Sequence, residues 1–345
     1  MKNIETLQKE RAKMLRQIGE QVSADRAYWV DSLTSIEPQA TAIDEIDKTI
    51  RTLLSYDKEL PYIADRTPIG QFRISLPFNN PIYSFVLYSC GIAIGGNTVI
   101  VRPSKITCEH VQKFFSKYKS FEEVGISLFI GSGKEFIEAA CRQDIPGGFL
   151  FTGAYDNLQD IQKKIPHSQQ LIYCGSGINP TIIGPNIKSI DEAVDLVISS
   201  RIYNSGQDCL CTEKIVVHES VYYEFVKKLI DKLDNVRLGE AGDKTADIYP
   251  PKGIAEERKE AYAEINGLKD KHLMSYWTAR LCDLIMTIRR EHSELIPEEI
   301  KSRIAENIGD LQAKHDTLER CLQVRNQLYD IYNKEYYRYL EESAL

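Results

Sequence analysis

Short runs of β-branched and aromatic residues alternate with helical stretches from Pro68 to about Leu233, and this alternation constrains the fold more than any other feature. Stretches of helical character at residues 82–90, 108–118 and 136–141 separate the first four runs, which are GQFRISLPFNNP, CGIAIGGNTVIVRPS, GISLFIGSG and GGFLFTGA. Strands and helices that alternate at these lengths predict a mainly parallel α/β sheet covered on both faces. Such doubly wound sheets bind nucleotides at the carboxyl ends of their strands.

The segments on either side of these four runs have other patterns. Residues 3–55 carry apolar positions at helical spacing and predict a helical lead-in, with a loop at residues 35–40. After the fourth run a second alternation predicts strand material in LIYCGSGINPTIIG, a helix at 190–203, a strand in EKIVVHE and a helix at 221–233. Strand signals stop at about residue 250.

Beyond residue 250 the chain is charged, with apolar positions three and four apart. One apolar stripe runs from Leu273 to Ile288, and a second runs from Ile304 to Tyr339 at nearly heptad spacing. Two long antiparallel helices are predicted, and the intermixed charges favour a packed seam over a surface that stacks nucleic-acid bases. Because the second helix is the longer one, its end is expected to contact a second copy of the chain or another protein.

Composition and cysteine spacing exclude several classes of function. The formal charge of −7, with 27% charged residues, leaves no positive excess for nucleic acid or anionic lipid. The N-terminus lacks a signal-peptide core and no run of about 18 apolar residues occurs, so a cytoplasmic protein without a membrane segment is expected. The eight cysteines are scattered, and Cys209 and Cys211 have no second pair nearby, so free thiols and no metal site are expected.

Five motifs carry a resemblance to a known family. PFNNP (77–81), GGNTVIVRPSKIT (95–107), FTGA (151–154), GSGINP (175–180) and NSGQDC (204–209) occur in the order and spacing of the aldehyde dehydrogenase superfamily. The resemblance extends over about residues 1–245. It implies a Rossmann-like aldehyde dehydrogenase fold, here incomplete. The all-α helical hairpin that is predicted to follow it lies outside the resemblance.

The resemblance implies a catalytic role for two residues. Cys209 matches the cysteine whose thiolate attacks an aldehyde and becomes a thioester after hydride transfer. A free cysteine has a pKa of about 8.5, so the site must raise the thiolate fraction or rely on the few per cent present at neutral pH. Asn79 matches the asparagine whose amide joins the backbone N–H of the cysteine in stabilising the oxyanion. A turn residue before Pro81 is the alternative interpretation of Asn79.

Cofactor residues are also implied by the resemblance. Arg102, Ser104 and Lys105 match the motif that contacts the adenosine ribose, but Lys105 replaces an acid. Two cations suit a 2′-phosphate, which favours NADP over NAD, unless Lys105 is only a solvated loop lysine. Backbone close to the cofactor is expected at three glycines, namely Gly131, Gly133 and Gly153.

Two departures from the family leave alternatives open. Cys174 replaces the glutamate that activates water in hydrolytic members, so coenzyme A or another thiol is the expected acyl acceptor. No counterpart of the family's E-x-F-G-P motif follows residue 245. The chain is therefore either an NAD(P)-dependent oxidoreductase acting on a small aldehyde or acyl substrate, or an inactive scaffold or fusion whose tail mediates assembly. The predicted parts are residues 1–170, a lead-in with a dinucleotide-binding domain; 171–250, a partial catalytic domain; and 251–345, the hairpin.

Overall fold

The computed structural model describes residues 4–142, 145–153, 155–175, 179–233, 235–237 and 239–249. The predicted hairpin of residues 251–345, and with it the predicted contact made by the tail, lies outside the described residues. The described residues belong to two compact units. The first contains residues within 4–181, 200–214 and 239–249, and the second contains residues within 182–199 and 215–237. The segment from 204 to 211 therefore belongs to the same unit as the first strands of the chain.

The elements follow the alternation expected from the sequence. The strands are β1 (Gln71–Ser75), β2 (Thr98–Arg102), β3 (Ile126–Leu128), β4 (Gly147–Thr152), β5 (Gln169–Cys174), β6 (Asn179–Ile183) and β7 (Thr212–Val217). The helices are α1 (Ile4–Ala24), α2 (Arg26–Thr34), α3 (Gln39–Ser55), α4 (Leu60–Ile63), α5 (Pro81–Phe85), α6 (Gly91–Ile94), α7 (Cys108–Lys117), α8 (Ser120–Glu123), α9 (Gly133–Cys141), α10 (Tyr155–Lys164), α11 (Ile190–Ile202) and α12 (Glu219–Leu233). Shorter helical turns are η1 (Tyr56–Glu59), η2 (Val86–Cys90) and η3 (Tyr203–Gly206).

The first unit is built on a five-stranded sheet in the order β3-β2-β1-β4-β5, and every pair in it is parallel. The register places Ser75 of β1 beside Arg102 of β2 and Phe151 of β4. This confirms the predicted doubly wound parallel sheet. The order reverses direction at β1, which has β2 on one side and β4 on the other, and such a point is where open α/β sheets bind ligands.

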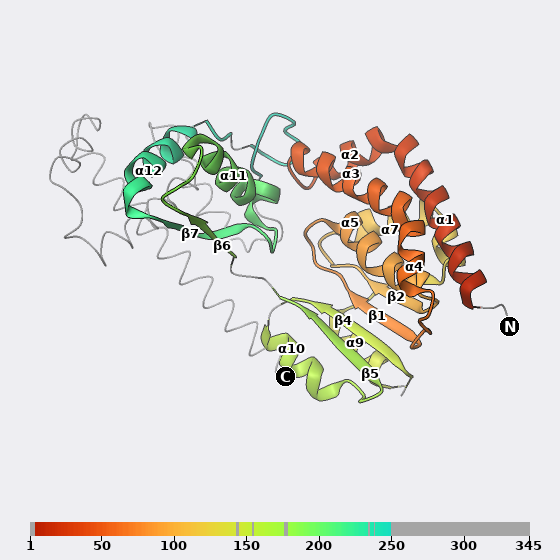
Figure 1. Cartoon of the computed structure of the whole chain (residues 1–345). Helices are drawn as coiled ribbons and strands as arrows, with labels where there is room; N and C mark the ends of the chain where they lie inside the picture. Colours follow the sequence, from red (N-terminus) through yellow and green to blue (C-terminus); the bar gives the residue numbers. More distant parts are fainter. Residues whose placement is uncertain are drawn as a thin grey trace. The chain divides into compact units, whose positions relative to one another are not determined.

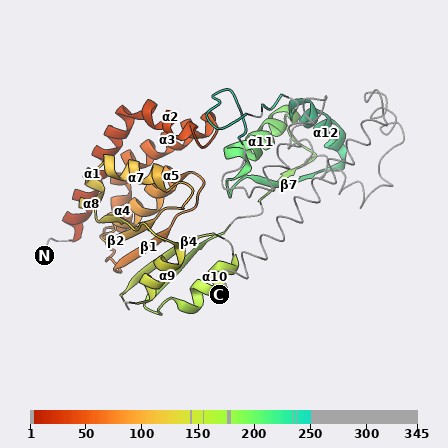
Figure 2. The same cartoon turned by 180° about the vertical axis from the view of Figure 1, so that it is seen from behind.

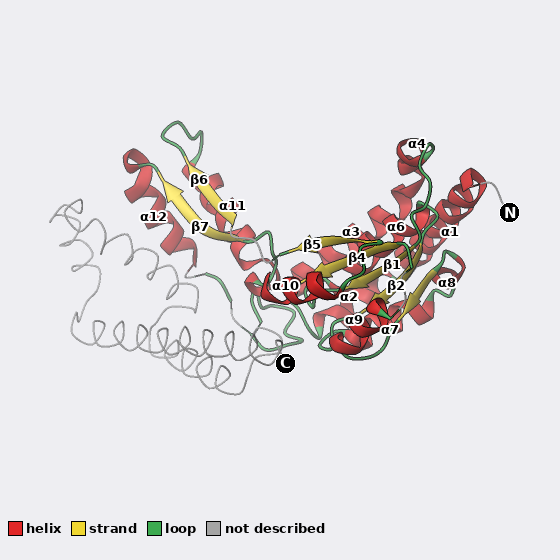
Figure 3. Ribbon diagram, turned by 90° about the horizontal axis from the view of Figure 1, so that it is seen from below, coloured by secondary structure: helices red, strands yellow, loops and turns green. Residues whose placement is uncertain are grey.

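Side chains alternate between the two faces of this sheet, as the pleat requires. Phe72, Ile74 and Leu150 join a core with the lead-in helices and α5 to α8, whereas Phe149 and Phe151 join a second core with α9 and α10. Figure 3 shows the strands side by side with helices on both faces. In both Figure 1 and Figure 2, α9 and α10 lie along β4 and β5. The sheet is thus buried from both sides, which leaves the strand ends as the accessible part of the scaffold.

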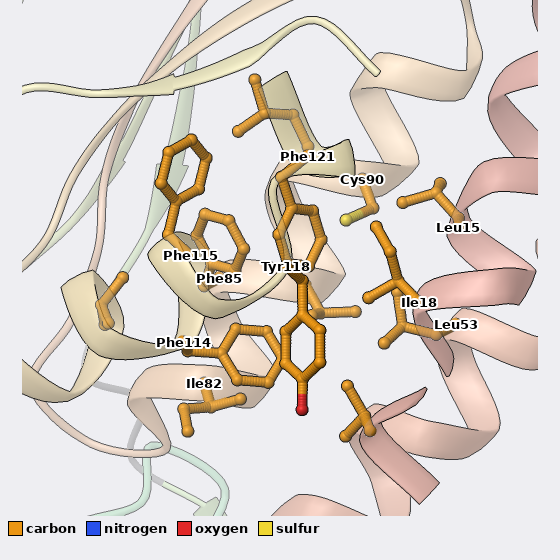
Figure 4. Packing of buried hydrophobic residues seen from close by; sticks show 14 of the residues in the cluster. Leu15, Ile18, Leu53, Ile82, Phe85, Cys90, Phe114, Phe115, Tyr118 and Phe121 are labelled. Carbon is orange, nitrogen blue, oxygen red and sulfur yellow. The ribbon is translucent and has the colours of Figure 1, made fainter. Parts of the chain in front are cut away.

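Aromatic rings dominate the larger core. Figure 4 shows Phe114, Phe115 and Phe121 packed around Phe85, with side chains of α1 and α3 alongside. The Phe85 and Phe121 ring centroids are 5.1 Å apart at an interplanar angle of 87°, the edge-to-face arrangement that aromatic pairs prefer. This packing fixes α5 against α7, and α3 packs against α5 in the same core. Helix α3 is also a neighbour of the candidate site.

The second unit is small and is described by itself. Its helices α11 and α12 are joined by ion pairs from Lys228 to Asp191 (2.6 Å) and from Lys232 to Asp195 (2.5 Å). The strands β6 and β7 form a two-stranded sheet, and the chain passes between the two units within each of these strands.

Several local features differ from the expectations. Helices α8 and α10 were not expected from the sequence, and the lead-in contains three helices because the chain breaks at Asp25 between α1 and α2. In α10 the apolar side chains that enter the core are Leu158 and Ile161, too few for a clear helical period in a polar segment. None of the helices in the described part of the chain is long and apolar enough to span a membrane.

Candidate functional site

The carboxyl edge of the five-stranded sheet gathers the residues singled out in the sequence. Asn79 follows β1, Arg102 is the last residue of β2 and precedes Ser104 and Lys105, and Cys174 is the last residue of β5. Gly131 and Gly133 follow β3, and Gly153 follows β4. Because the strands are parallel, all of these positions lie at one edge of the sheet.

The turn that leads into Cys209 has an unusual backbone. Asn204 (φ 48°), Ser205 (φ 57°) and Gly206 (φ 73°) are three consecutive residues with positive φ, and the first two carry side chains. Each non-glycine residue in this region costs on the order of 1 to 3 kcal/mol and persists only when its surroundings hold it. Both side chains are buried, and Tyr249 N donates to Ser205 Oγ at 2.9 Å. Such strain is typical of functional loops.

The two cysteines of the loop have different surroundings. Cys209 is exposed, and its backbone carbonyl accepts a hydrogen bond from Asn179 Nδ2. Cys211 is buried, and its thiol donates to the carbonyl of Tyr203 at 3.5 Å. A reagent can therefore reach Cys209 but not Cys211, in keeping with the sequence-based choice of Cys209.

The electrostatics around Cys209 disfavour its thiolate. Burial of part of the side chain raises the pKa of Cys209, and the neighbouring Asp208 carboxylate raises it further, while a backbone hydrogen bond opposes both. Burial raises the pKa of Cys211 to about 11 and that of Cys90 to about 12. Of the two possibilities left open for Cys209, an activated thiolate and a small thiolate fraction, the surroundings of its side chain favour the second.

Asn80 was not singled out from the sequence. Its side chain connects the loop after β1 to the loop that contains Cys209. Its Nδ2 donates to Asp208 Oδ2 at 2.7 Å, and its Oδ1 accepts from Asn204 Nδ2 at 3.5 Å. Asn80 is buried and left-handed (φ 46°, ψ 55°) although it precedes Pro81, a position that disfavours helical backbone. The PFNNP motif predicts a turn at Asn80. It does not predict that the Asn80 side chain contacts the Cys209 loop.

Asn79 keeps its amide available. Its side chain is half-buried and makes no hydrogen bond to any residue that the structure describes, while its backbone carbonyl accepts from Ser84 Oγ at 3.5 Å. Asn79 is followed by Asn80, whose side chain donates to Asp208 in the Cys209 loop. The Asn79 amide is therefore able to donate to an anionic oxygen that forms at Cys209.

Tyr88 and Cys174 lie near the thiol. Burial raises the pKa of Tyr88 to about 12, with further contributions from Cys174, Cys209 and Asp208. Cys174 is half-buried and is one of the groups that raise the pKa of Tyr88. Neither group is a carboxylate, so neither matches the base that hydrolytic chemistry requires at neutral pH.

Arg102 and Lys105, at the end of β2 and just after it, form a basic rim. Arg102 Nε donates to the carbonyl of Gly131 at 3.2 Å, and Lys105 is exposed. Thr152 Oγ1, at the end of β4, is buried and has no hydrogen-bond partner among the described residues. Two cations and an unsatisfied hydroxyl at the carboxyl edge can bind the anionic and polar groups of a nucleotide.

Packing alone explains why two of the three candidate cofactor-binding positions, 131 and 153, are glycine. A Cβ on Gly131 would lie 2.7 Å from the ring of Phe129, and one on Gly153 would lie 2.6 Å from the ring of Phe151. At Gly133 a Cβ would meet only ordinary contact with the Arg102 guanidinium, at 3.7 Å. Close packing of aromatic rings therefore accounts for Gly131 and Gly153 without a ligand. Among the described residues no group of three or more His, Cys, Asp or Glu side chains could hold a metal ion.

We expect Cys209 to be the first of the described cysteines that limiting iodoacetamide labels, with a rate that rises with pH. Because its pKa is raised, the midpoint should lie above the ordinary value of about 8.5. Asp208→Asn keeps the side-chain shape but removes the charge, so it should lower the midpoint and speed labelling at pH 7. Peptide mass spectrometry over a pH series measures this, with Asp31→Asn as a remote control. Faster labelling of Cys141 or Cys174 would contradict the assignment.

Comparisons with known proteins agree with this architecture. The model of the aldehyde dehydrogenase family matches residues 2–265, more than half of the chain. The 2-aminomuconic semialdehyde dehydrogenase of Mus musculus is 29% identical over 189 residues, covering 53% of this chain and 38% of that protein. Lactaldehyde dehydrogenase of Methanococcus aeolicus is 26% identical over 232 residues, covering 61% of this chain and 49% of that protein. The chain thus spans about half, or less, of the length of these relatives.

Solved structures share the fold. Lactaldehyde dehydrogenase from Escherichia coli superposes with a TM-score of 0.67 at 20% identity, covering 76% of this chain and 59% of that chain. Glyceraldehyde-3-phosphate dehydrogenase from Methanocaldococcus jannaschii, complexed with NADP, superposes with a TM-score of 0.62 at 19% identity, covering 76% of this chain and 61% of that chain. At these identities the likeness concerns the fold alone.

Proposed function

This chain belongs to the aldehyde dehydrogenase family, and we propose that it oxidises a small aldehyde with NADP or NAD through a thioester on Cys209. The observation that carries the proposal is the exposed Cys209 in a strained turn that Asp208 ties to the loop of Asn79 and Asn80. A nucleophile, an available amide donor and a basic rim belong to one unit of the structure. The nucleophile and the amide donor match the aldehyde dehydrogenase motifs of the sequence, whereas Lys105 stands where that family has an acid.

The chemistry assigns one task to each residue. The Cys209 thiolate attacks the carbonyl carbon, a C–S bond forms, and the carbonyl electron pair moves onto oxygen. Asn79 Nδ2, together with the backbone N–H of Cys209, donates to that oxyanion. A bound nicotinamide dinucleotide supplies the hydride acceptor. When the carbonyl re-forms, the carbon has lost a hydride, and Cys209 carries a thioester.

The second half-reaction is proposed to use a thiol. With Cys174 in place of the glutamate, hydrolysis should lose about 10²- to 10⁴-fold relative to a site with a carboxylate base. A thiolate such as that of coenzyme A needs no such base: it attacks the thioester carbonyl, the bond to Cys209 breaks, and Cys209 leaves as a thiolate. Thiol-dependent turnover is therefore the form of activity we expect.

The basic rim is proposed to select the cofactor. Lys105→Glu should weaken NADP binding by about tenfold and shift the preference to NAD, because a carboxylate repels a 2′-phosphate and accepts from a 2′-hydroxyl. Titration calorimetry with both dinucleotides on the full chain measures this. Lys58→Glu, at an exposed lysine of η1, is the control and should leave both affinities unchanged. An unchanged preference would identify Lys105 as a solvated loop lysine.

One experiment tests the function as a whole. The full chain is incubated with each dinucleotide and a short aldehyde, and mass spectrometry follows acylation of Cys209 while absorbance follows the reduced nicotinamide. We expect stoichiometric reduction without a thiol acceptor and repeated turnover after coenzyme A is added. Turnover without any thiol would contradict the proposal that a thiol is the acyl acceptor, and it would indicate that the site has a base that activates water.

The alternative is an inactive scaffold located in the cytoplasm, which assembles through residues 251–345 with a second copy or another protein. The loss of the glutamate at Cys174 and the lack of a counterpart of the E-x-F-G-P motif in residues 246–345 favour it. If the chain neither bound a dinucleotide nor became acylated in the same experiment, the result would support the inactive scaffold. Binding and acylation together would exclude it.

A further inference from the structure

Three side chains on α3 accept hydrogen bonds from the two loops that the proposed chemistry uses. Thr41, Asp44 and Glu45 are spaced i, i+3 and i+4, so they share one face of the helix. Their donors lie just before the Cys209 loop and just after Asn79. One helix therefore contacts both loops at once.

Glu45 closes the beginning of α5. Its Oε1 accepts from the backbone N–H groups of Ile82 (2.6 Å) and Tyr83 (2.9 Å), and the residue is completely buried. The first N–H groups of a helix have no partner within the helix, and the N-cap residue Asn80 makes no capping bond. The carboxylate of Glu45 therefore fixes where α5 begins, two residues after Asn79.

Thr41 and Asp44 hold the other loop. Thr41 Oγ1 accepts from the backbone N–H of Asn204 at 3.1 Å, and Asp44 Oδ2 accepts from the hydroxyl of Tyr203 at 2.7 Å. Thr41 is only 3% exposed. Asn204 is the first of the consecutive left-handed residues that precede Cys209, so the bond from Thr41 lies where the strained turn begins.

Helix α3 is itself firmly placed. Ala42, Ile46 and Leu53 are fully buried in the main core. Arg26 Nε and Nη2 donate to the two carboxylate oxygens of Asp47 at 2.6 and 2.9 Å, a bidentate pair that ties α3 to α2. A helix anchored in this way can fix the position of loops that have no regular structure of their own.

We propose that α3 is the positioning element of the site: Thr41 and Glu45 set the placement of Cys209 relative to Asn79 by holding the loop of each. The inference rests on the function proposed above, because it takes those two residues as the reacting pair. Neither Thr41 nor Glu45 touches the substrate, and each acts through a backbone that it holds.

The test compares Thr41→Val with Thr49→Val in the full chain. Thr49 is another fully buried threonine of α3, and its hydroxyl donates to the backbone carbonyl of Glu45 at 2.8 Å, within the helix. Both variants remove one hydroxyl from the same helix, but only Thr41→Val removes the acceptor for Asn204. The readout is the pH profile of Cys209 alkylation by iodoacetamide, with thermal unfolding measured alongside.

Thr41→Val should raise the alkylation rate of Cys209 at pH 7 by about three- to tenfold and move the midpoint to lower pH, because a released loop loses the burial that disfavours the thiolate. Thr49→Val and Thr41→Ser should stay within about twofold of the parent, since the serine hydroxyl would still offer an acceptor oxygen to Asn204. Tyr203→Phe removes the donor to Asp44 without changing shape. It should shift the profile in the same direction and serves if Thr41→Val does not fold.

A second measurement addresses Glu45. Amide exchange of Ile82 and Tyr83 should accelerate in Glu45→Ala but much less in Glu45→Gln, which keeps an acceptor oxygen. Identical alkylation profiles for Thr41→Val and Thr49→Val would overturn the positioning role. Because alkylation needs neither aldehyde nor dinucleotide, a chain with the Thr41 effect but no thioester would contradict only the proposed function.

Discussion

Replacing Cys209 with serine should abolish acylation of the chain and lower turnover by about 10³-fold or more. A serine hydroxyl needs a general base to become a nucleophile, whereas a thiol has a usable thiolate fraction near neutral pH. The titratable groups near the Cys209 thiol include Asp208, Cys174 and Tyr88. Asp208 is the carboxylate among them, and it already accepts from Asn80 and from the backbone N–H of Leu210. Serine at this position would therefore have no free base.

Cys211→Ser is the matched control for this substitution. It changes the same atom two residues away in the same loop, and a hydroxyl can replace the thiol that donates to the Tyr203 carbonyl. Acylation should remain within about threefold, as the loss of one weak buried hydrogen bond implies. Intact-mass detection of the acyl adduct measures both variants. If Cys209→Ser still formed an adduct, another residue would have to be the nucleophile.

The sheet was predictable because its cause is local. Runs such as QFRIS and TVIVR are short, β-branched and bounded by Gly or Pro, and they became β1 and β2. Helix α10 was missed because its core contacts come from Leu158 and Ile161 alone, and a polar segment with two apolar residues has no distinct period. The strands and helices were thus predictable wherever the hydrophobic periodicity of the sequence was strong.

The site was predictable only as far as motifs reach. Cys209 and Asn79 stand in short motifs whose order along the chain carries the family resemblance. The bond from Asn80 to Asp208 joins residues 128 positions apart, and the bond from Glu45 to the start of α5 spans 37 positions. A side chain that accepts from a distant backbone N–H leaves no spacing pattern in the sequence, so only the three-dimensional structure reveals it.

The raised pKa of Cys209 also bears on how the site would operate. Burial and Asp208 raise the pKa of Cys209, and the thiolate is the form that reacts with a carbonyl carbon. Reactivity then depends on stabilising the oxyanion formed after attack rather than on a permanently ionised nucleophile. This places most of the rate enhancement on the donors around the carbonyl oxygen, of which Asn79 is the side-chain candidate.

Asn79→Ala should therefore slow thioester formation by about 10²- to 10³-fold, equivalent to about 3 to 4 kcal/mol of transition-state stabilisation. The fold should tolerate the change, because the Asn79 side chain makes no hydrogen bond to the described residues. Alkylation of Cys209 by iodoacetamide passes through no tetrahedral oxyanion. Because the Asn79 side chain does not hold the loop either, the alkylation rate should stay within about twofold of the parent rate.

Asn80→Ala provides the contrast, because it removes the 2.7 Å bond to Asp208 and frees the Cys209 loop on one side. It should alter alkylation and thioester formation together, since a displaced loop changes both the exposure and the aim of the thiol. Single-turnover acylation and iodoacetamide labelling, measured on both variants, separate the two roles. An Asn79→Ala chain that acylates at the parent rate would show that the amide does not serve the oxyanion, whereas equal losses in both assays would show that Asn79 holds the loop instead.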